Sequence, residues 1–377
     1  MFAHRLLLFL LCKDTLETGF CQTGLRPPSS GTGKTNYLLL LIVSNDSIKK
    51  MKSPYEITPA ILKSISAVSQ KIGEVNAKLL VRQHPELRKQ NRIKTIHSSL
   101  NIEGNTLSEK QITAIIENKR VTGPEKDIKE VINALEVYRE LKNFNCHLEK
   151  DFLRAHKLLM NGLIQKPGKY RTQGVGIIKG SKVAHIAPSH ENVRFLMNDL
   201  FDYLKDKTEL TLIKSCVFHY EMEFIHPFMD GNGRMGRLWQ TAILMSEYPL
   251  LEFLPFETLI SKNQSDYYHA LSLSDKEGTS TNFIEFMLDI LDQSLAELLE
   301  NTAKKPNETE RLYLFLEQFT RAFTRKDYMR QYPELSTATA SRDLKNGVRK
   351  GMIEQSGDKR TAHYKKTLSI SISSLRP

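Results

Sequence analysis

Residues 226–237 read HPFMDGNGRMGR, a polar stretch with three glycines that separates two apolar helical patterns. Apolar residues upstream recur at helical spacing, and we expect Pro227 to end that helix. Because proline disfavours a helical backbone at the preceding residue, we expect an extended backbone at His226. Gly231 and Gly233 allow positive φ and a close approach of the backbone to a ligand. The stretch therefore predicts a glycine-bearing loop between two helices.

The residue types in this loop favour a site for phosphate chemistry. A glycine-rich loop that enters a helix presents free N–H groups and the positive end of the helix dipole, which together bind anions. Arg234 and Arg237 lie three residues apart in the first turn, so both guanidinium groups can reach one anion. Asp230 supplies the hard oxygen ligand that Mg²⁺ prefers, and His226 can accept a proton near neutral pH. The set predicts phosphoryl or nucleotidyl transfer. The alternative is a helix corner in which these side chains only cap and pair.

The same residues resemble the signature of the Fic-domain family, His-Pro-Phe-x-(Asp/Glu)-Gly-Asn-Gly-Arg-x-x-Arg, with every specified position present. The resemblance covers roughly residues 58–299 and implies a mainly α-helical Fic fold that carries a β-hairpin flap. It also implies a protein adenylyltransferase, which moves AMP from ATP to a Ser, Thr or Tyr hydroxyl of a target protein or of itself. Two alternatives stay open. One is a Fic-type enzyme that transfers another phosphate-containing group or removes AMP, and the other is a nucleotide-sensing transcription regulator that binds DNA.

The hypothesised mechanism gives a role to each residue of the signature. His226 removes the proton from the target hydroxyl as it attacks the α-phosphate, and such general-base help is worth ~10²–10⁴ in rate. Asp230 holds Mg²⁺ on the α- and β-phosphates, and the backbone around Asn232 stabilises charge that develops on the phosphate oxygens. The Asn232 side chain would also contact the α-phosphate, and Arg234 and Arg237 neutralise the β- and γ-phosphates. The ATP-binding candidates are Asp230, Gly231, Asn232, Gly233, Arg234, Met235, Gly236, Arg237, Tyr267, Tyr268 and His185.

Residues 99–104 read SLNIEG and resemble the Fic inhibitory motif, (Ser/Thr)-x-x-x-Glu-(Gly/Asn), with Ser99, Glu103 and Gly104 in register. A glycine commonly ends a helix, so we expect Glu103 in the last turn of one. A carboxylate there opposes the helix dipole and needs another group to stabilise it. The resemblance implies that Glu103 pairs with Arg237 and occupies the arginine that otherwise holds the γ-phosphate. The alternative is a frayed helix end with an exposed glutamate.

Two short β-branched runs, residues 173–179 and 182–186, flank a Gly-Ser pair and predict a β-hairpin. The resemblance makes residues 173–186 the flap, on which a target segment docks by main-chain pairing beside the signature loop. His185 matches the end of the family's flap by its position. Ordinary structural strands are the alternative reading of the hairpin.

Tyr267 and Tyr268 open a predicted helix and are expected first as packing residues. In the family, a Tyr-Tyr pair lies beside the adenine pocket, so the resemblance implies that one of them stacks on the base. The family often has an asparagine one helical step further on. Ser274 and Asp275 stand there instead, so the sequence departs from the family pattern at this contact.

The composition is that of an ordinary soluble protein, and the formal net charge of +11 favours acidic partners such as nucleotides or nucleic acid. Four cysteines are scattered without metal-binding spacing, and Cys146 and Cys216 lie within apolar helical patterns. Both are expected to be reduced core residues, which favours a cytoplasmic protein. We expect no membrane partner.

Residues 1–50 fit poorly with the rest and are expected to be a disordered extension or the product of a start assigned too early, with Met51 as the true start. Their apolar run at 6–11 resembles a signal-peptide core but is too short to span a membrane. A secreted or anchored protein is the minority alternative. The GTGKT sequence at 31–35 lacks the first glycine of a P-loop.

Two units are expected after residue 50. Residues 51–300 form the Fic domain with its inhibitory helix, and a polar linker leads from it to residues 308–368. This last segment predicts three short helices and a basic hairpin, which together resemble a winged helix-turn-helix. From residue 308 to the end there are fourteen Lys/Arg and eight Asp/Glu, so the segment could contact DNA, or it could dock another protein. The sequence leaves a homodimer open.

Overall fold

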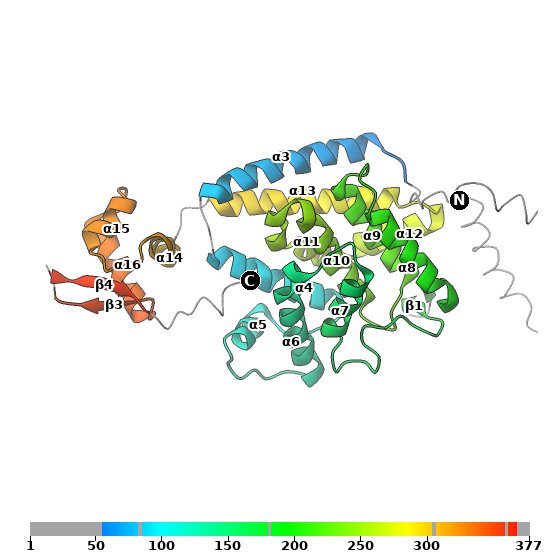
Figure 1. The fold of residues 1–377 in the computed structure, drawn as a ribbon, viewed down its shortest axis with the longest axis horizontal. Coiled ribbons are helices and arrows are strands. Elements are labelled where there is room, and N and C mark those ends of the chain that lie inside the picture. The colour runs from blue at the N-terminus through cyan, green and yellow to red at the C-terminus, as the bar shows by residue number, and fades with distance from the viewer. Residues whose placement is uncertain (1–54, 82–84, 180–181, 304–306, 359–360, 368–377) are drawn as a thin grey trace, which may run out of the picture.

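The computed structural model describes residues 55–81, 85–179, 182–303, 307–358 and 361–367. This part of the chain is mainly α-helical (Figure 1), as the sequence predicts. The extension at 1–50, with its P-loop-like and signal-like stretches, lies outside the described residues. None of the described helices is both long enough and apolar enough to cross a membrane.

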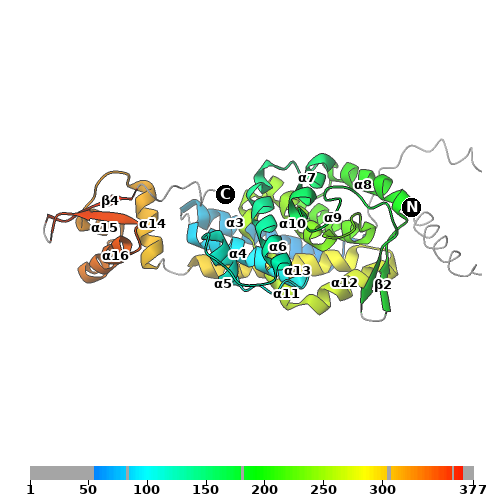
Figure 2. The same ribbon diagram turned by 90° about the horizontal axis from the view of Figure 1, so that it is seen from below.

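The main body packs its helices around one continuous apolar core, which runs from Ile61 to Leu298. Its two longest helices, α3 and α13, pack against each other along one edge (Figures 1 and 2). The helices are α3 Pro59–Val81, α4 Pro85–Ile102, α5 Glu109–Ile116, α6 Glu125–Arg139, α7 Glu149–Leu159, α8 His190–Leu204, α9 Thr211–Ile225, α10 Asn232–Glu247, α11 Phe256–Lys262, α12 Gln264–Glu277 and α13 Thr281–Ala303, with 3-10 turns η1 Leu141–Asn143 and η2 Pro249–Phe253.

Helices α9 and α10 form the centre of the body and are buried on nearly all sides. A helix buried in this way needs internal partners for its polar groups. Trp239 of α10 is fully buried and donates its indole N–H to the carbonyl of Cys146 at 3.1 Å. Phe152 of α7 lies edge-on to that indole, with ring centroids 5.1 Å apart, and also contacts Phe228 in the loop between α9 and α10. This aromatic cluster anchors the signature loop to the core.

The apolar pattern of residues 125–144 predicts one continuous helix, and this prediction is wrong at its C-terminal end. Helix α6 stops at Arg139, and a 3-10 turn follows at Leu141–Asn143. Residues three apart eclipse in a 3-10 turn, so Leu141 and Phe144 both face the core, where they are 1% and 8% exposed. The 3-10 turn therefore directs both apolar side chains to the same side, whereas in a continuing α-helix they would point in different directions.

The predicted hairpin is present and projects from the helical body (Figure 2). Strand β1 (Gly176–Lys179) pairs antiparallel with β2 (Lys182–Ile186), and a bulge lies between Ile177 and Ile178. His185 lies in β2 opposite Ile177, but its side chain is outside the described part of the structure.

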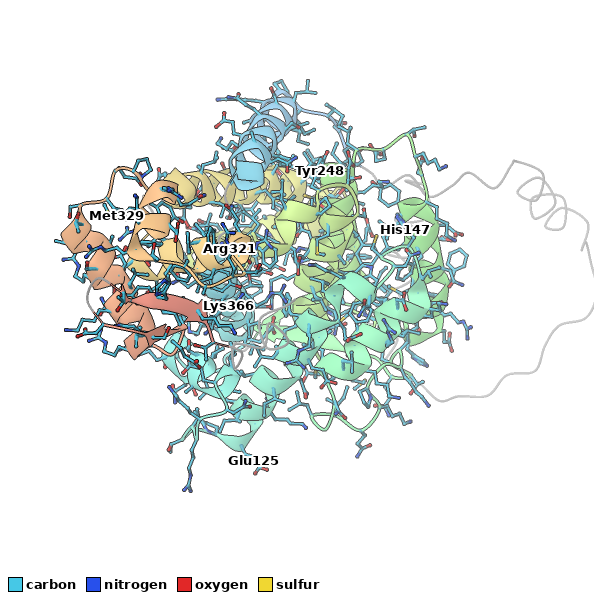
Figure 3. All side chains as sticks on the ribbon, turned by 60° about the vertical axis from the view of Figure 1, so that its left-hand side comes forward. Glu125, His147, Tyr248, Arg321, Met329 and Lys366 are labelled. Atoms are coloured by element: carbon cyan, nitrogen blue, oxygen red, sulfur yellow. The ribbon has the colours of Figure 1, made fainter. Side chains whose placement is uncertain are left out.

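The C-terminal segment has its own small core, distinct from that of the main body. It contains α14 Glu308–Gln318, α15 Arg325–Gln331, α16 Thr337–Arg349, β3 Ile353–Ser356 and β4 His363–Lys366. These are the three helices and the hairpin that the sequence predicts, and Figure 3 labels Met329 on α15 and Lys366 on β4. The polar linker predicted between residues 300 and 308 is shorter than expected at both ends. Helix α13 continues to Ala303, and Asn307 caps α14 through a capping box with Glu310.

Candidate active site

The histidine of the signature ends helix α9 in a left-handed conformation. His226 has φ 49° and ψ 60°, and its N–H donates to the carbonyl of Met222 at 2.9 Å. The predicted extended backbone is therefore wrong. Proline excludes the right-handed helical region for the residue before it, but a helix commonly ends in the left-handed region, where histidine is tolerated better than most residues.

This geometry orients the imidazole ring. Nδ1 of His226 lies 3.3 Å from the carbonyl oxygen of Glu223, one turn back on α9. A carbonyl oxygen only accepts hydrogen bonds, so a proton on Nδ1 satisfies it and leaves Nε2 as the acceptor. The His226 residue is only partly buried. The site therefore holds a histidine in the tautomer that a general base requires.

Only one of the two predicted loop glycines adopts a positive φ. Gly231, with φ +85°, is the N-cap residue of α10, whose N-terminus has no side-chain cap. The free N–H groups of such a turn can bind an anion. Gly233 lies inside α10 with a helical backbone, so the positive φ expected there is wrong. Its lack of a side chain matters for another reason. A Cβ at Gly233 would collide with the carboxylate of Glu103 and lie 3.2 Å from Nη1 of Arg237.

The side chain of Asn232 holds the loop together and is not directed at a ligand. Its Oδ1 accepts from the N–H of Phe228 and its Nδ2 donates to the carbonyl of Phe228, both at 2.9 Å. Asn232 is 2% exposed. The predicted side-chain contact with the α-phosphate therefore has no support in this arrangement, whereas the Asn232 backbone N–H remains in the uncapped first turn of α10.

His156 on α7 supports the loop, and the sequence analysis did not identify it. Its ring stacks on Phe228, with centroids 3.6 Å apart and planes 4° from parallel. Nδ1 accepts from the N–H of Gly168 at 2.8 Å, so the proton lies on Nε2, which donates to the carbonyl of Asp230 at 3.0 Å. Burial lowers the pKa of His156 to about 4, although the bond to Asp230 opposes this shift. His156 is therefore neutral at physiological pH.

Asp230 and Arg234 form an ion pair at the mouth of the loop. Oδ1 of Asp230 accepts from the N–H of Gly231 at 2.6 Å and lies 3.1 Å from Nη2 of Arg234. Nη1 of Arg234 is bound by Glu130 of α6, also at 3.1 Å. Glu130 was missed by the sequence reasoning, and its second oxygen accepts from Asn105, just after the inhibitory motif, at 2.8 Å. Arg234 is thus held between two carboxylates and is almost completely buried.

The segment 99–104 lies against the second arginine of the signature. Nη2 of Arg237 is 2.7 Å from Oε1 of Glu103, and Arg237 also donates to the hydroxyl and the carbonyl of Ser99 at 3.1 and 2.9 Å. Burial alone would lower the pKa of the fully buried Arg237, but the Glu103 carboxylate raises it above its usual value. Gly104, with φ +89°, turns the chain away from α4. Arg234 and Arg237 do not share an anion here, because each has its own carboxylate.

The two tyrosines occupy different environments. Tyr267 is 1% exposed, and its hydroxyl donates to Nε2 of His219, whose Nδ1 lies 2.7 Å from Oε1 of Gln240. Burial lowers the pKa of His219 to about 3, so this imidazole is neutral and part of the core. Tyr268 is only partly buried. Tyr267 is therefore a packing residue, and Tyr268 is the tyrosine left to contact a base. Asp275 accepts a hydrogen bond from Tyr220 at 3.0 Å.

A metal ion would depend on a single carboxylate. Among the described residues, no group of three or more His, Cys, Asp or Glu side chains could hold a metal. Mg²⁺ commonly takes one or two carboxylates and completes its shell with phosphate oxygens and water. Asp230 fits such a role, since its side chain is 49% exposed and its Oδ2 makes no hydrogen bond within the described chain.

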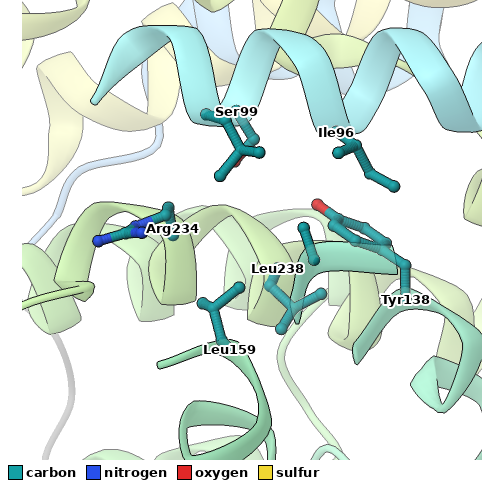
Figure 4. Close-up of a pocket in the computed structure, with 8 residues that line it drawn as sticks. Ile96, Ser99, Tyr138, Leu159, Arg234 and Leu238 are labelled. Carbon is teal, nitrogen blue, oxygen red and sulfur yellow. The ribbon is translucent and has the colours of Figure 1, made fainter. Parts of the chain in front are cut away.

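Helices α4, α6 and α10, with Leu159 at the end of α7, enclose a small pocket beside Arg234 (Figure 4). Its lining includes Ser99, Tyr138 and Arg234, but neither His226 nor Asp230. Most of the lining is apolar, and the pocket is far too small for a nucleotide. It is a small packing defect between the helices.

A helical body with this loop defines a class of domain, and comparison with known proteins gives it a name. The Fic/DOC family matches residues 146–244. The crystal structure of a Fic family protein from Desulfovibrio desulfuricans G20 is 39% identical, with a TM-score of 0.64, over 84% of this chain and 99% of that one. This chain belongs to the Fic family. A solved structure of Fic-1 from C. elegans, 22% identical with a TM-score of 0.53, shares the fold.

Curated relatives carry an activity in their names. "Protein adenylyltransferase Fic" of Drosophila willistoni is 30% identical over 226 residues, which are 56% of this chain and 43% of the relative. "Protein adenylyltransferase fic-1" of Caenorhabditis elegans is 32% identical over 194 residues, 48% of this chain and 36% of the relative. This chain thus spans less than half the length of these relatives.

Proposed function

We propose that this protein is a protein adenylyltransferase, which moves AMP from ATP to a Ser, Thr or Tyr hydroxyl of a target protein and of itself. The observation that carries the proposal is the loop that runs from His226, whose Nδ1 faces the Glu223 carbonyl, to the N-terminus of α10, which has no side-chain cap. A proton acceptor next to an anion site is the pair of groups that attack on a phosphate requires. The names of the curated relatives support the same activity.

In the proposed reaction, Nε2 of His226 takes the proton as the target oxygen attacks the α-phosphorus, and pyrophosphate leaves. The N–H groups of the first turn of α10, around Gly233, stabilise charge on the phosphate oxygens. Asp230 Oδ2 would hold Mg²⁺, which neutralises phosphate charge when bound. Arg234 and Arg237 pair with the outer phosphates. Tyr268 contacts the adenine.

We also propose that the protein is autoinhibited. Arg237 can hold the γ-phosphate only after it releases Glu103, which now lies 2.7 Å away. The Glu103 side chain is 31% exposed and faces the bare backbone of Gly233. A γ-phosphate bound to Arg237 would bring two like charges together, so Glu103 and a productively bound ATP exclude each other.

The target segment is proposed to pair with the hairpin of β1 and β2 through main-chain hydrogen bonds, which accept many side-chain sequences. We place the reaction in the cytoplasm, in keeping with the buried free thiols of Cys146 and Cys216. Transfer of another phosphate-containing group, or removal of AMP, is the second candidate, since the same loop could serve either reaction.

A nucleic-acid partner is proposed for the C-terminal segment. Arg342, Lys345 and Arg349 are exposed on one face of α16, while the intervening Asp343 is buried and paired with Arg311 at 2.8 Å. Binding of a labelled random duplex should weaken strongly between 50 and 200 mM salt, as about 10³-fold losses are typical of several phosphate contacts. Salt-independent or absent binding would favour a protein-docking role instead.

The experiment that tests the activity uses the Glu103→Gly protein with ATP labelled at either the α- or the γ-phosphate, alone and with host lysate. We expect the α-label to join protein and the γ-label to stay in solution. His226→Ala should lower transfer by ~10²–10⁴, whereas His269→Ala, which removes an exposed histidine of α12, should not. Transfer of the γ-label, or full activity without His226, would refute the proposal.

A further inference from the structure

Arg171 is a buried arginine in the turn before the hairpin, with 3% of its surface exposed. Its Nε donates to the carbonyl of His226 at 2.8 Å, and its Nη1 donates to the carbonyl of Gln173 at 3.0 Å. Nη2 donates to the carbonyl of Pro188 and, at 3.3 Å, to that of Ile225. One guanidinium group therefore binds four backbone carbonyls.

These carbonyls belong to two separate elements. Gln173 precedes β1 and Pro188 follows β2, so they are the two stems of the hairpin. Ile225 and His226 are the last turn and the cap of α9. The backbone N–H of Arg171 adds a fifth bond, to the carbonyl of Pro227 at 2.9 Å. A single residue thus joins both stems of the hairpin to the backbone that carries the His226 imidazole.

The chemistry of this contact requires a guanidinium group. In the described part of the chain, no carboxylate forms an ion pair with Arg171, and burial lowers its pKa. The charge is stabilised instead by carbonyls, two of which lie at the negative end of the α9 dipole. A planar fork with five N–H donors can reach four carbonyls in different directions. A lysine ammonium has three donors and no such fixed fork.

We infer that Arg171 is a positioning residue, which sets the His226 imidazole relative to a target segment paired with the hairpin. The inference rests on the proposed function, because only a reaction on a docked hydroxyl needs a fixed distance between the His226 imidazole and the segment paired with the hairpin. His226 holds a left-handed backbone, a strained state for a residue with a side chain. Arg171 binds the carbonyl of that residue and so helps to hold it there.

The test compares Arg171→Lys and Arg171→Ala in the Glu103→Gly background, with the protein's own modification by α-labelled ATP as the reaction. A displacement of about 1 Å can cost 10²-fold in rate. We therefore expect the maximal rate to fall about 10²-fold in Arg171→Ala and about 10-fold in Arg171→Lys, with the KM for ATP unchanged. Guanidinium ion should partly rescue Arg171→Ala. Arg154→Lys, which alters an exposed arginine bound to the Asn143 carbonyl, should change nothing.

Hydrogen exchange gives a readout that needs no activity. In Arg171→Lys, amides of the hairpin stems and of the loop at 225–231 should exchange faster together, while those of α13 stay protected. An unchanged maximal rate, a loss confined to the KM for ATP, or exchange that rises in only one of the two segments would overturn the inference. If the Glu103→Gly parent transfers no label, the proposed function fails, and the exchange data still decide whether Arg171 couples the segments.

Discussion

Nε2 of His156 lies 3.0 Å from the carbonyl oxygen of Asp230, so a histidine outside the signature holds the backbone of the signature loop by a hydrogen bond. The pKa of His156 falls from 6.5 to about 4 in the folded protein, because the ring is buried. Between these pH values the unfolded chain binds more protons, so this contribution to stability is present above pH 6.5 and is lost as the pH drops towards 4.

The first prediction is that His156→Phe reduces the acid sensitivity of the fold. Phe keeps the stack on Phe228 but leaves the N–H of Gly168 and the carbonyl of Asp230 unpaired, at a cost of about 1–3 kcal/mol near pH 7.5. Urea unfolding at several pH values should show that this cost shrinks as the pH falls from 6.5 to 4. A cost that stays constant across the range would contradict a buried neutral imidazole at this position.

Some of this site could be predicted because its signals are local in the sequence. The glycines, the arginines and Asp230 lie within residues 226–237, and the helix end at Gly104 is marked by one residue. The hairpin is marked by two short β-branched runs around a Gly-Ser pair. The resemblance to a family then predicted the ion pair of Glu103 with Arg237, two residues that are 134 positions apart in the chain.

The supporting residues could not be found in this way. His156, Arg171 and Glu130 reach partners that are 74, 55 and 104 positions away. Each looks like an ordinary polar residue in a helix or turn, and only packing brings it to the loop. The left-handed backbone of His226 was missed for a related reason. The rule for a residue before proline disfavours only the right-handed helical region. Whether the residue is then extended or left-handed depends on how the helix ends, and α9 ends in the left-handed region.

The second prediction concerns Glu257 of α11, the helix that packs against α4. Burial raises the pKa of Glu257 to about 8, from 4.5. The folded protein therefore binds more protons between these values, so stability is lost as the pH rises from 4.5 to 8. Since each pKa unit is worth about 1.36 kcal/mol, we expect Glu257→Gln to be more stable than the parent by at least about 2 kcal/mol at pH 8.

Urea unfolding at pH 5 and pH 8 checks this prediction, since the advantage of Glu257→Gln should grow with pH. Glu297→Gln is the matched control, because that carboxylate is 52% exposed and faces Lys262 at 3.7 Å. An equal pH response of the two variants would mean that Glu257 is ionised in the fold.

The third prediction separates the two halves of the inhibitory contact. Ser99→Ala removes the bond between the hydroxyl and Nε of Arg237 but keeps Glu103 in place. A hydrogen bond to a charged group is worth about 1.5–3 kcal/mol, so auto-modification should rise about 10-fold, less than in Glu103→Gly. Ser98→Ala, at the neighbouring position bound to Thr258, should leave the rate unchanged. Equal activation by both serine variants would point to a general loosening of α4.

The fourth prediction concerns the carboxylate that holds the first arginine. Glu130→Gln keeps the hydrogen bond to Arg234 but removes the negative charge. The ion pair between Arg234 and Asp230 should therefore become stronger. We expect a loss of about 1–3 kcal/mol in stability and a higher Mg²⁺ requirement for transfer, because Asp230 is then less free to bind a cation. Glu136→Gln, on an exposed position of the same helix, controls for the change in net charge. An unchanged Mg²⁺ dependence would show that Glu130 does not influence cation binding at Asp230.

The fifth prediction uses binding alone and so does not depend on turnover. A ligand that binds only the folded protein raises the unfolding free energy by RT ln(1 + [L]/Kd), about 2.7 kcal/mol at 100 times Kd. Because Glu103 occupies Arg237 at 2.7 Å, ATP with Mg²⁺ should raise the Tm of Glu103→Gly more than that of the parent. ADP lacks the γ-phosphate, so it should distinguish the two proteins less. Arg237→Ala in the Glu103→Gly background should remove the preference for ATP over ADP. Equal shifts of the parent and Glu103→Gly with ATP would show that Glu103 and the γ-phosphate do not compete for Arg237.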